Sequence, residues 1–279
     1  MEIGGHPMEE DWNLFERIRD REQVLVFMNT ALKQKAPFIG YGQRITIVFN
    51  MYSLWDLSDS STQKAQQAFY ELEDKLISRM KDQGYALYAG RISSNNKMEM
   101  YFYAKDDWDW EREMKRVLAD FPNFRYYFSR NLDADWSFYL EEMAPSPLEE
   151  QWMRNAKIAY ALKRRGDNLE KAREVQHWLH FPDSTRMDAM KSKVGALGYR
   201  IIVSEFDTTR QVEPYVLHLS KLHTLDVPTV NAVTKELFVL AAEVGGTYDG
   251  WGTRLILRFP AKLRAHLKRI FLKMISAFK

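Results

Sequence analysis

Two stretches of this chain share a pattern of strand residues at an offset of 114 positions. Gly84-Tyr85-Ala86-Leu87 and Gly198-Tyr199-Arg200-Ile201 each begin a predicted strand. Met100-Tyr101-Phe102-Tyr103 and Pro214-Tyr215-Val216-Leu217 lie in the strand that follows. A repeat at this spacing predicts two similar domains rather than one large enzyme.

Both halves have the predicted order strand-helix-strand-strand-helix-strand, which is the split βαβ arrangement of ferredoxin-like folds. In the first half the helices are expected at 62–81 and 106–120, and in the second at 185–197 and 228–243. A hairpin of residues 12–28 precedes the first set, and Ala144-Pro145-Ser146-Pro147 is the linker candidate. The sequence therefore predicts an α+β chain of two tandem ferredoxin-like α/β-sandwich domains with a C-terminal amphipathic helix. The expected parts are residues 9–143, 148–257 and a basic tail, 260–279.

Composition excludes several classes of protein. The 279 residues are 46% apolar and 14% aromatic, so the chain is not disordered. It contains no cysteine, which excludes disulfides and thiolate chemistry. The start, Met1 to Pro7, lacks the basic and apolar regions of a signal peptide, and no apolar run has the length of a membrane span. We expect a cytoplasmic protein.

The basic charge is concentrated at the C-terminus. Residues 252–279 carry eight Lys and Arg and no acidic side chain, and the rest of the chain is neutral to acidic. From Pro260 onward, apolar residues recur at helical spacing among basic ones. Such a helix can dock on its own body, bind an acidic partner or nucleic acid, or lie on an anionic membrane. Sequence-specific recognition of nucleic acid is not expected.

The search for catalytic chemistry finds no motif, and we expect no catalytic residue, no metal and no cofactor. His177 and His180 are three apart in a predicted strand, so they point to opposite faces. The densest carboxylate group is Asp106, Asp107, Asp109, Glu111 and Glu113. These acids begin a predicted helix, where they complement its dipole, and this interpretation is favoured over an acid–base site.

The run Tyr248-Asp249-Gly250-Trp251-Gly252-Thr253 follows a predicted helix and a glycine turn. With the strand at Gly198-Tyr199, it resembles the ribonuclease E inhibitor B family (RraB) over about residues 170–254. The resemblance implies a ferredoxin-like fold and inhibition by direct binding to a ribonuclease. Members of that family are acidic, whereas here the second half is neutral, so the target does not follow from the resemblance.

The first half is similar to another bacterial family, domain of unknown function 695, over about residues 9–143. The segments that carry this similarity include Tyr88-Ala89-Gly90-Arg91-Ile92, Tyr101-Phe102-Tyr103-Ala104 and Asp135-Trp136-Ser137-Phe138-Tyr139. It implies no known activity. In both halves a tryptophan, Trp136 or Trp251, follows the closing strand, and burial against its own sheet is favoured over ligand binding.

These observations predict a non-catalytic regulator that binds a protein partner, with a ribonuclease as a possible target. It would act by occlusion, which means that it covers the functional surface of the partner. The candidate binding residues are Tyr248, Asp249, Trp251 and Thr253. Two alternatives are an enzyme with a site between the domains and a membrane-surface adaptor that uses the tail. The oligomeric state is not predicted.

Overall fold

The computed structural model describes residues 2–3, 6–7, 10–51, 59–82, 84–105 and 109–257. Contacts divide the chain into two compact units, residues 1–146 and 147–279. The division falls inside the proline-containing stretch suggested as a linker. Asp106, Asp107 and the predicted tail, 260–279, lie outside the described residues.

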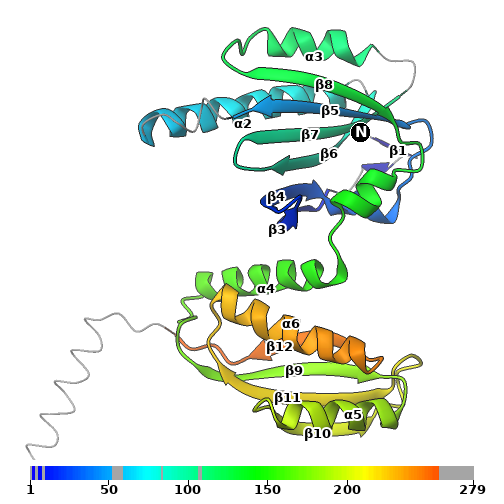
Figure 1. The fold of residues 1–279 in the computed structure, drawn as a ribbon, viewed down its shortest axis with the longest axis vertical. Coiled ribbons are helices and arrows are strands. Elements are labelled where there is room, and N and C mark those ends of the chain that lie inside the picture. Colours follow the sequence, from blue (N-terminus) through cyan, green and yellow to red (C-terminus); the bar gives the residue numbers. More distant parts are fainter. Residues whose placement is uncertain are drawn as a thin grey trace, which may run out of the picture. The chain divides into compact units, whose positions relative to one another are not determined.

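Unit 1 is built on a six-stranded antiparallel sheet in the order β3-β4-β6-β7-β5-β8 (Figure 1). A separate two-stranded ladder joins β1 and β2. The elements are β1 (Glu2–Ile3), β2 (His6–Pro7), β3 (Trp12–Arg19), β4 (Glu22–Asn29), the 3₁₀ turn η1 (Thr30–Gln34), β5 (Gln43–Asn50), α2 (Asp59–Asp82), β6 (Ala86–Ser93), β7 (Lys97–Ala104), α3 (Trp110–Leu118), β8 (Arg125–Leu132) and the π-helical η2 (Phe138–Met143).

One face of this sheet packs against α2 and α3. Alternate residues of β5 and β7, such as Ile47 and Phe102, are fully buried there, as the period of two requires. From α2, which covers the helix predicted at 62–81, Phe69 and Leu72 meet them at helical spacing.

Unit 2 is an antiparallel sheet of four strands in the order β10-β11-β9-β12 (Figure 1). Its elements are α4 (Pro147–Arg164), β9 (Arg173–Phe181), α5 (Ser184–Gly195), β10 (Arg200–Phe206), β11 (Tyr215–His223), α6 (Val227–Glu243) and β12 (Thr247–Thr253). Leu179 and Leu217 point toward α5 and α6, which share one core on that face. The opposite face, called the open face below, carries the intervening side chains, among them Trp178 and His218.

Helix starts follow the expected chemistry with two shifts. Asp226 accepts a hydrogen bond from the Thr229 amide at 3.0 Å and Pro228 occupies the first turn of α6, as predicted. The helix predicted at 185–197, which implies a cap at Ser184, begins at Ser184 instead, and Asp183 is its cap because the aspartate side chain accepts the Arg186 amide at 2.9 Å. Asp109 plays the same part at α3.

The repeat survives as an element order but not as a fixed offset. The starts of β6 and β10, Ala86 and Arg200, are separated by 114 residues, whereas those of β8 and β12 are separated by 122. A longer β10–β11 connection and a longer α6 in unit 2 account for the drift, partly offset by shorter connections on both sides of α6.

The two tryptophans that follow the closing strands are both buried, as expected, but they are not equivalent. Trp136 is fully buried and stacks on Tyr103 with ring centroids 3.8 Å apart. Tyr103 is the neighbour of the helix-facing Phe102, so Trp136 lies on the face away from α2 and α3. Trp251 instead packs with Val230 of α6. The two tryptophans are 115 residues apart, one more than the repeat offset of 114. This spacing does not show that they lie on different faces of their sheets.

Candidate functional site

A β-bulge in β12 determines how the Tyr-Asp-Gly-Trp-Gly-Thr motif is presented. Tyr248 lies opposite Leu179 of β9, but the register shifts before Gly250, and Trp251 then lies opposite His177. Residues three apart in a regular strand point to opposite faces. The extra residue of the bulge places Tyr248 and Trp251 on the same, helix-covered face.

A buried polar chain runs from Tyr248 across the sheet. Its hydroxyl lies 3.1 Å from Nδ1 of His177, and Nε2 of His177 lies 3.3 Å from Nε2 of His223. Nδ1 of His223 lies 2.7 Å from the carbonyl oxygen of Thr224, which can only accept. His223 therefore carries its proton on Nδ1, His177 carries its own on Nε2, and Tyr248 donates to Nδ1 of His177.

This arrangement keeps both histidines neutral. Burial, together with the neighbouring His223, lowers the pKa of His177 to about 3. Burial likewise lowers the pKa of His223, against the opposing effect of the Thr224 carbonyl. A second proton on His223 would bring two N–H groups face to face across the 3.3 Å contact. A second proton on His177 would occupy Nδ1, the atom that accepts the hydrogen bond from Tyr248.

The second inward residue of the motif attaches β12 to α4. Nε1 of Trp251 donates to Oδ1 of Asn155 at 2.7 Å, and Nδ2 of Asn155 donates to the Thr234 hydroxyl of α6 at 3.0 Å. Gln151 of α4 donates to the carbonyl oxygen of Tyr248 at 3.1 Å. The motif therefore holds two helices to an edge strand through buried hydrogen bonds, whose loss is costly in the interior.

The outward residues of the motif lie beside the open face. The carboxylate of Asp249, whose side chain is 65% exposed, lies 3.6 Å from Nε2 of His180. Gly252 lies under the Trp178 ring, where an added Cβ would be 3.2 Å from the ring carbons. Trp178 in turn stacks on His218, with ring centroids 4.8 Å apart. This surface of Asp249, Gly252, Trp178 and His218 is called the motif surface below.

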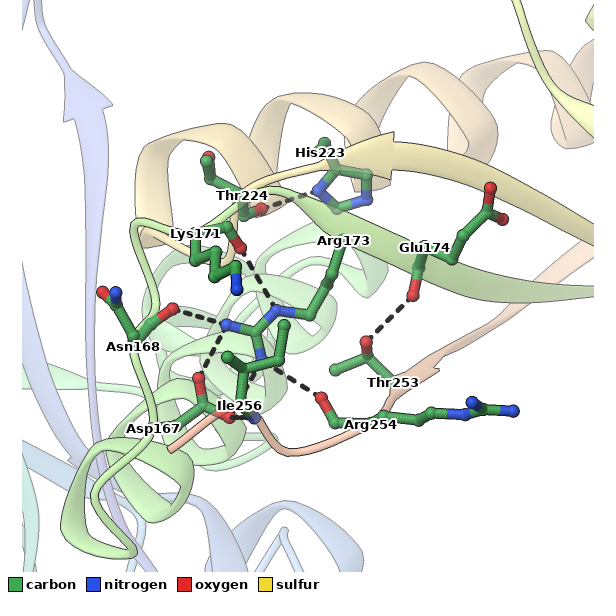
Figure 2. A network of polar contacts seen from close by, with 10 residues as sticks. All are labelled: Asp167, Asn168, Lys171, Arg173, Glu174, His223, Thr224, Thr253, Arg254 and Ile256. Atoms are coloured by element: carbon green, nitrogen blue, oxygen red, sulfur yellow. Dashed lines mark hydrogen bonds and ion pairs between the residues drawn. The ribbon is translucent and has the colours of Figure 1, made fainter. Parts of the chain in front are cut away.

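The end of β12 is fixed by a buried ion pair (Figure 2). Both guanidinium nitrogens at the tip of Arg173 donate to Asp167, at 2.7 and 2.9 Å, and the side chains are 5% and 0% exposed. The remaining donors reach the carbonyl oxygens of Lys171, Asn168 and Arg254. All five N–H donors of Arg173 are thus used.

Asp167 also accepts the amide of Ile256 at 3.0 Å. Although burial raises the pKa of Asp167, the bonds from Arg173 and Ile256 outweigh it and leave the pKa below its usual value. Thr253 closes the motif, with its hydroxyl donating to the carbonyl oxygen of Glu174 at 3.0 Å.

The four predicted binding residues therefore divide into two pairs. Tyr248 and Trp251 are 2% and 9% exposed, whereas Asp249 and Thr253 keep access to solvent. Sequence reasoning did not single out Trp178, and it did not foresee the contact between His177 and His223. The alternation of apolar and polar residues in β9 gives the face of each side chain, but no sequence signal gives the pairing with β11.

The described members of the carboxylate cluster in unit 1 all have structural partners. Asp109 caps α3, Glu111 pairs with Lys115, and the buried Glu113 pairs with Arg79 and Arg116. Across the described residues, no three His, Asp or Glu side chains are grouped closely enough to hold a metal ion.

Comparison with known proteins finds a similar family for each part of the chain. Residues 152–253 match the family described as Regulator of ribonuclease activity B. The second unit is similar to ribonuclease regulators. Residues 10–143 match a family of unknown function, DUF695. Both resemblances drawn from the sequence are confirmed.

One curated relative is the Regulator of ribonuclease activity B from Xenorhabdus nematophila. It is 28% identical over 110 residues, which is 39% of this chain and 78% of that protein. A crystal structure of an unknown protein from Galdieria sulphuraria covers 74% of this chain and 95% of its own at 10% identity. Its TM-score of 0.20 carries no argument about the fold. None of the helices in the described part of the chain has the length and apolar character needed to cross a bilayer.

Proposed function

We propose that this chain is a non-catalytic regulator that binds a ribonuclease through unit 2 and covers part of the enzyme's working surface. The match of residues 152–253 to a family of ribonuclease regulators carries the proposal. The relative from Xenorhabdus nematophila supports it, because its similarity spans most of that protein's length.

We further propose that both units are ferredoxin-like domains, spanning residues 9–143 and 148–257, and that the protein works in the cytoplasm. The strand orders β8-β5-β7-β6 and β12-β9-β11-β10 support the fold, since each follows the same path through its sheet. The element order in each unit is that of the split βαβ arrangement.

The contact is proposed to lie on the motif surface and to centre on Asp249, since Thr253 follows Trp251 by two residues and shares its helix-covered face. Tyr248 and Trp251 act on binding indirectly, because their buried hydrogen bonds fix the bulge that turns Asp249 outward. A half-buried aromatic pair beside an exposed carboxylate suits a partner with a basic, partly apolar surface. A ribonuclease has such a surface where it holds RNA phosphates.

The test measures inhibition of a ribonuclease E-type endoribonuclease from the host, together with its binding to the full chain. Asp249→Lys reverses the charge of the motif surface, and we expect at least about a tenfold loss of inhibition and binding. Asp188→Lys is the matched control, because Asp188 of α5 is also 65% exposed but belongs to the other side of the sheet.

Three outcomes separate the alternatives. Equal loss in both variants would indicate a general charge effect and would contradict the proposed surface. Unchanged ribonuclease activity with the unmodified chain, at concentrations above that of the enzyme, would reject the regulator proposal. A chain that ends at residue 257 and still inhibits would place the activity outside the basic tail.

A further inference from the structure

Unit 1 contains a cavity where its sheet extends beyond its helices. The hairpin β3–β4 adds two strands beyond β6, whereas α2 packs over β6 and its neighbours in the central part of the sheet. The resulting notch between α2 and strands β3, β4 and β6 has a volume of about 320 Å³. This is within the size range of small-molecule sites in proteins.

A β-bulge arranges the floor of this cavity. The register between β6 and β7 shifts between Tyr88 and Gly90, so Tyr88 and Arg91 both face α2. Both bind the same buried carboxylate: the Tyr88 hydroxyl donates to Oε1 of Glu73 at 2.6 Å, and Arg91 donates to Oε2. Glu73 is only 5% exposed, so its charge is neutralised inside the protein.

Aromatic rings form the wall opposite α2. Trp12 stacks on Phe27 with ring centroids 4.9 Å apart and an interplanar angle of 16°. It also contacts Tyr88, with centroids 5.4 Å apart. Ile77 of α2 completes the apolar part of the lining. A flat apolar group would therefore find aromatic surface on one side and an aliphatic side chain on the other.

The charges around the cavity are balanced except for one. Glu10 accepts from Lys81 at 2.5 Å and from the indole N–H of Trp12 at 3.0 Å, and the bond from Lys81 lowers the pKa of Glu10. Glu73 is paired with Arg91. Asp74 also lines the cavity, is exposed, and has no ion-pair partner among the described residues.

The lining therefore combines one unneutralised negative charge with aromatic rings. Aromatic faces attract cations through the ring quadrupole, and a carboxylate at the rim adds to this attraction.

We propose that this cavity binds a small organic cation, an amine joined to a flat apolar body. The site is separate from the motif surface of unit 2, so the proposal does not depend on the ribonuclease partner. It gives the first unit a role as a ligand-binding domain.

The experiment titrates the full chain with three probes that share a phenyl ring and differ in charge. Phenethylamine is the cation, 2-phenylethanol the neutral analogue and phenylacetate the anion. Binding is followed by calorimetry and by ligand-observed NMR. We expect phenethylamine to bind at least about fivefold more tightly than either of the others.

Two variants locate the site and one serves as a control. Asp74→Asn should reduce the preference for the amine over the alcohol to less than about twofold. Ile77→Trp should abolish binding of all three probes by filling the cavity. Glu71→Gln, on the same helix but outside the cavity, should change nothing. Asp74 is exposed, so its variant tests the proposal even where Ile77→Trp does not fold.

The proposal is overturned if phenylacetate binds best, if the three probes bind equally, or if no probe binds at millimolar concentration. Undiminished binding by a folded Ile77→Trp variant would also overturn it, because the probes would then occupy another place.

Discussion

Replacing His177 by glutamine tests whether the buried histidine pair of unit 2 is neutral. In the folded protein the pKa of His177 is lowered to about 3, first by burial and then by the neighbouring His223. The pKa of a histidine in the unfolded chain is about 6.5. Below that pH the unfolded chain binds a proton that the folded chain excludes. Stability is therefore fully present above about pH 6.5 and is lost progressively as the pH falls toward about 3.

Linkage gives the magnitude of the loss. A single histidine with these two pKa values removes about 2 kcal/mol of unfolding free energy between about pH 7 and pH 5. Because pH 5 lies well above the folded pKa, this amount depends on the unfolded pKa and hardly on the folded one. Carboxylates titrate mainly below this interval, so they contribute little to the difference between variant and wild type.

The assay is urea unfolding of the full chain at several pH values, with amide exchange in residues 173–181 reporting on unit 2. His177→Gln should be less stable than wild type at pH 7 but should lose about 2 kcal/mol less on going to pH 5. Tyr248→Phe is the control, because it removes the hydroxyl that donates to His177 and keeps the histidine. Its pH dependence should match that of wild type. An equal slope in His177→Gln and wild type would refute the reasoning, since another group would then be responsible.

Three further changes have expected outcomes in thermal or urea unfolding. Asp167→Ala leaves a buried guanidinium without its carboxylate and should cost about 3–5 kcal/mol. Trp251→Phe removes the donor to the buried Oδ1 of Asn155 and should cost about 1–3 kcal/mol, with little effect on unit 1. Gly90→Ala should destabilise unit 1 by about 1–3 kcal/mol more than Gly250→Ala destabilises unit 2. A Cβ at Gly90 would lie 2.2 Å from a backbone oxygen of β4, whereas at Gly250 no atom lies within 4 Å. Similar costs at the two glycines would contradict this comparison.

Regular elements of this chain could be predicted because their signals are local. The β-branched run in β5 and the apolar spacing in α2 each follow the period of one element. The residues at which helices begin were harder to predict. Asp183 and Ser184 are neighbours, and both residue types are good caps. Only the observed hydrogen bond to the Arg186 amide distinguishes them.

The candidate site could be predicted only in part, because bulges and pairings are properties of two strands together. The glycines near Tyr248 and Trp251 allow a turn, but they do not show that both side chains point inward. The pairing of His177 with His223 depends on how β9 and β11 are aligned, over a separation of 46 residues. The repeat offset likewise cannot show that Trp136 and Trp251 lie on different faces of their sheets.

The same four-residue pattern, Tyr-X-Gly-X, produces a bulge in both units with different consequences. In unit 1, Tyr88-Ala89-Gly90-Arg91 lies in β6, which has strands on both sides, so the residue inside the bulge, Ala89, is fully buried. In unit 2, Tyr248-Asp249-Gly250-Trp251 lies in β12, at the edge of its sheet. The corresponding Asp249 is therefore exposed. Each bulge directs two side chains toward a helix, but only an edge strand leaves the residue between them accessible to a partner. This difference in strand position supports the placement of the protein contact at Asp249 of unit 2, because the bulge of unit 1 leaves no such residue accessible.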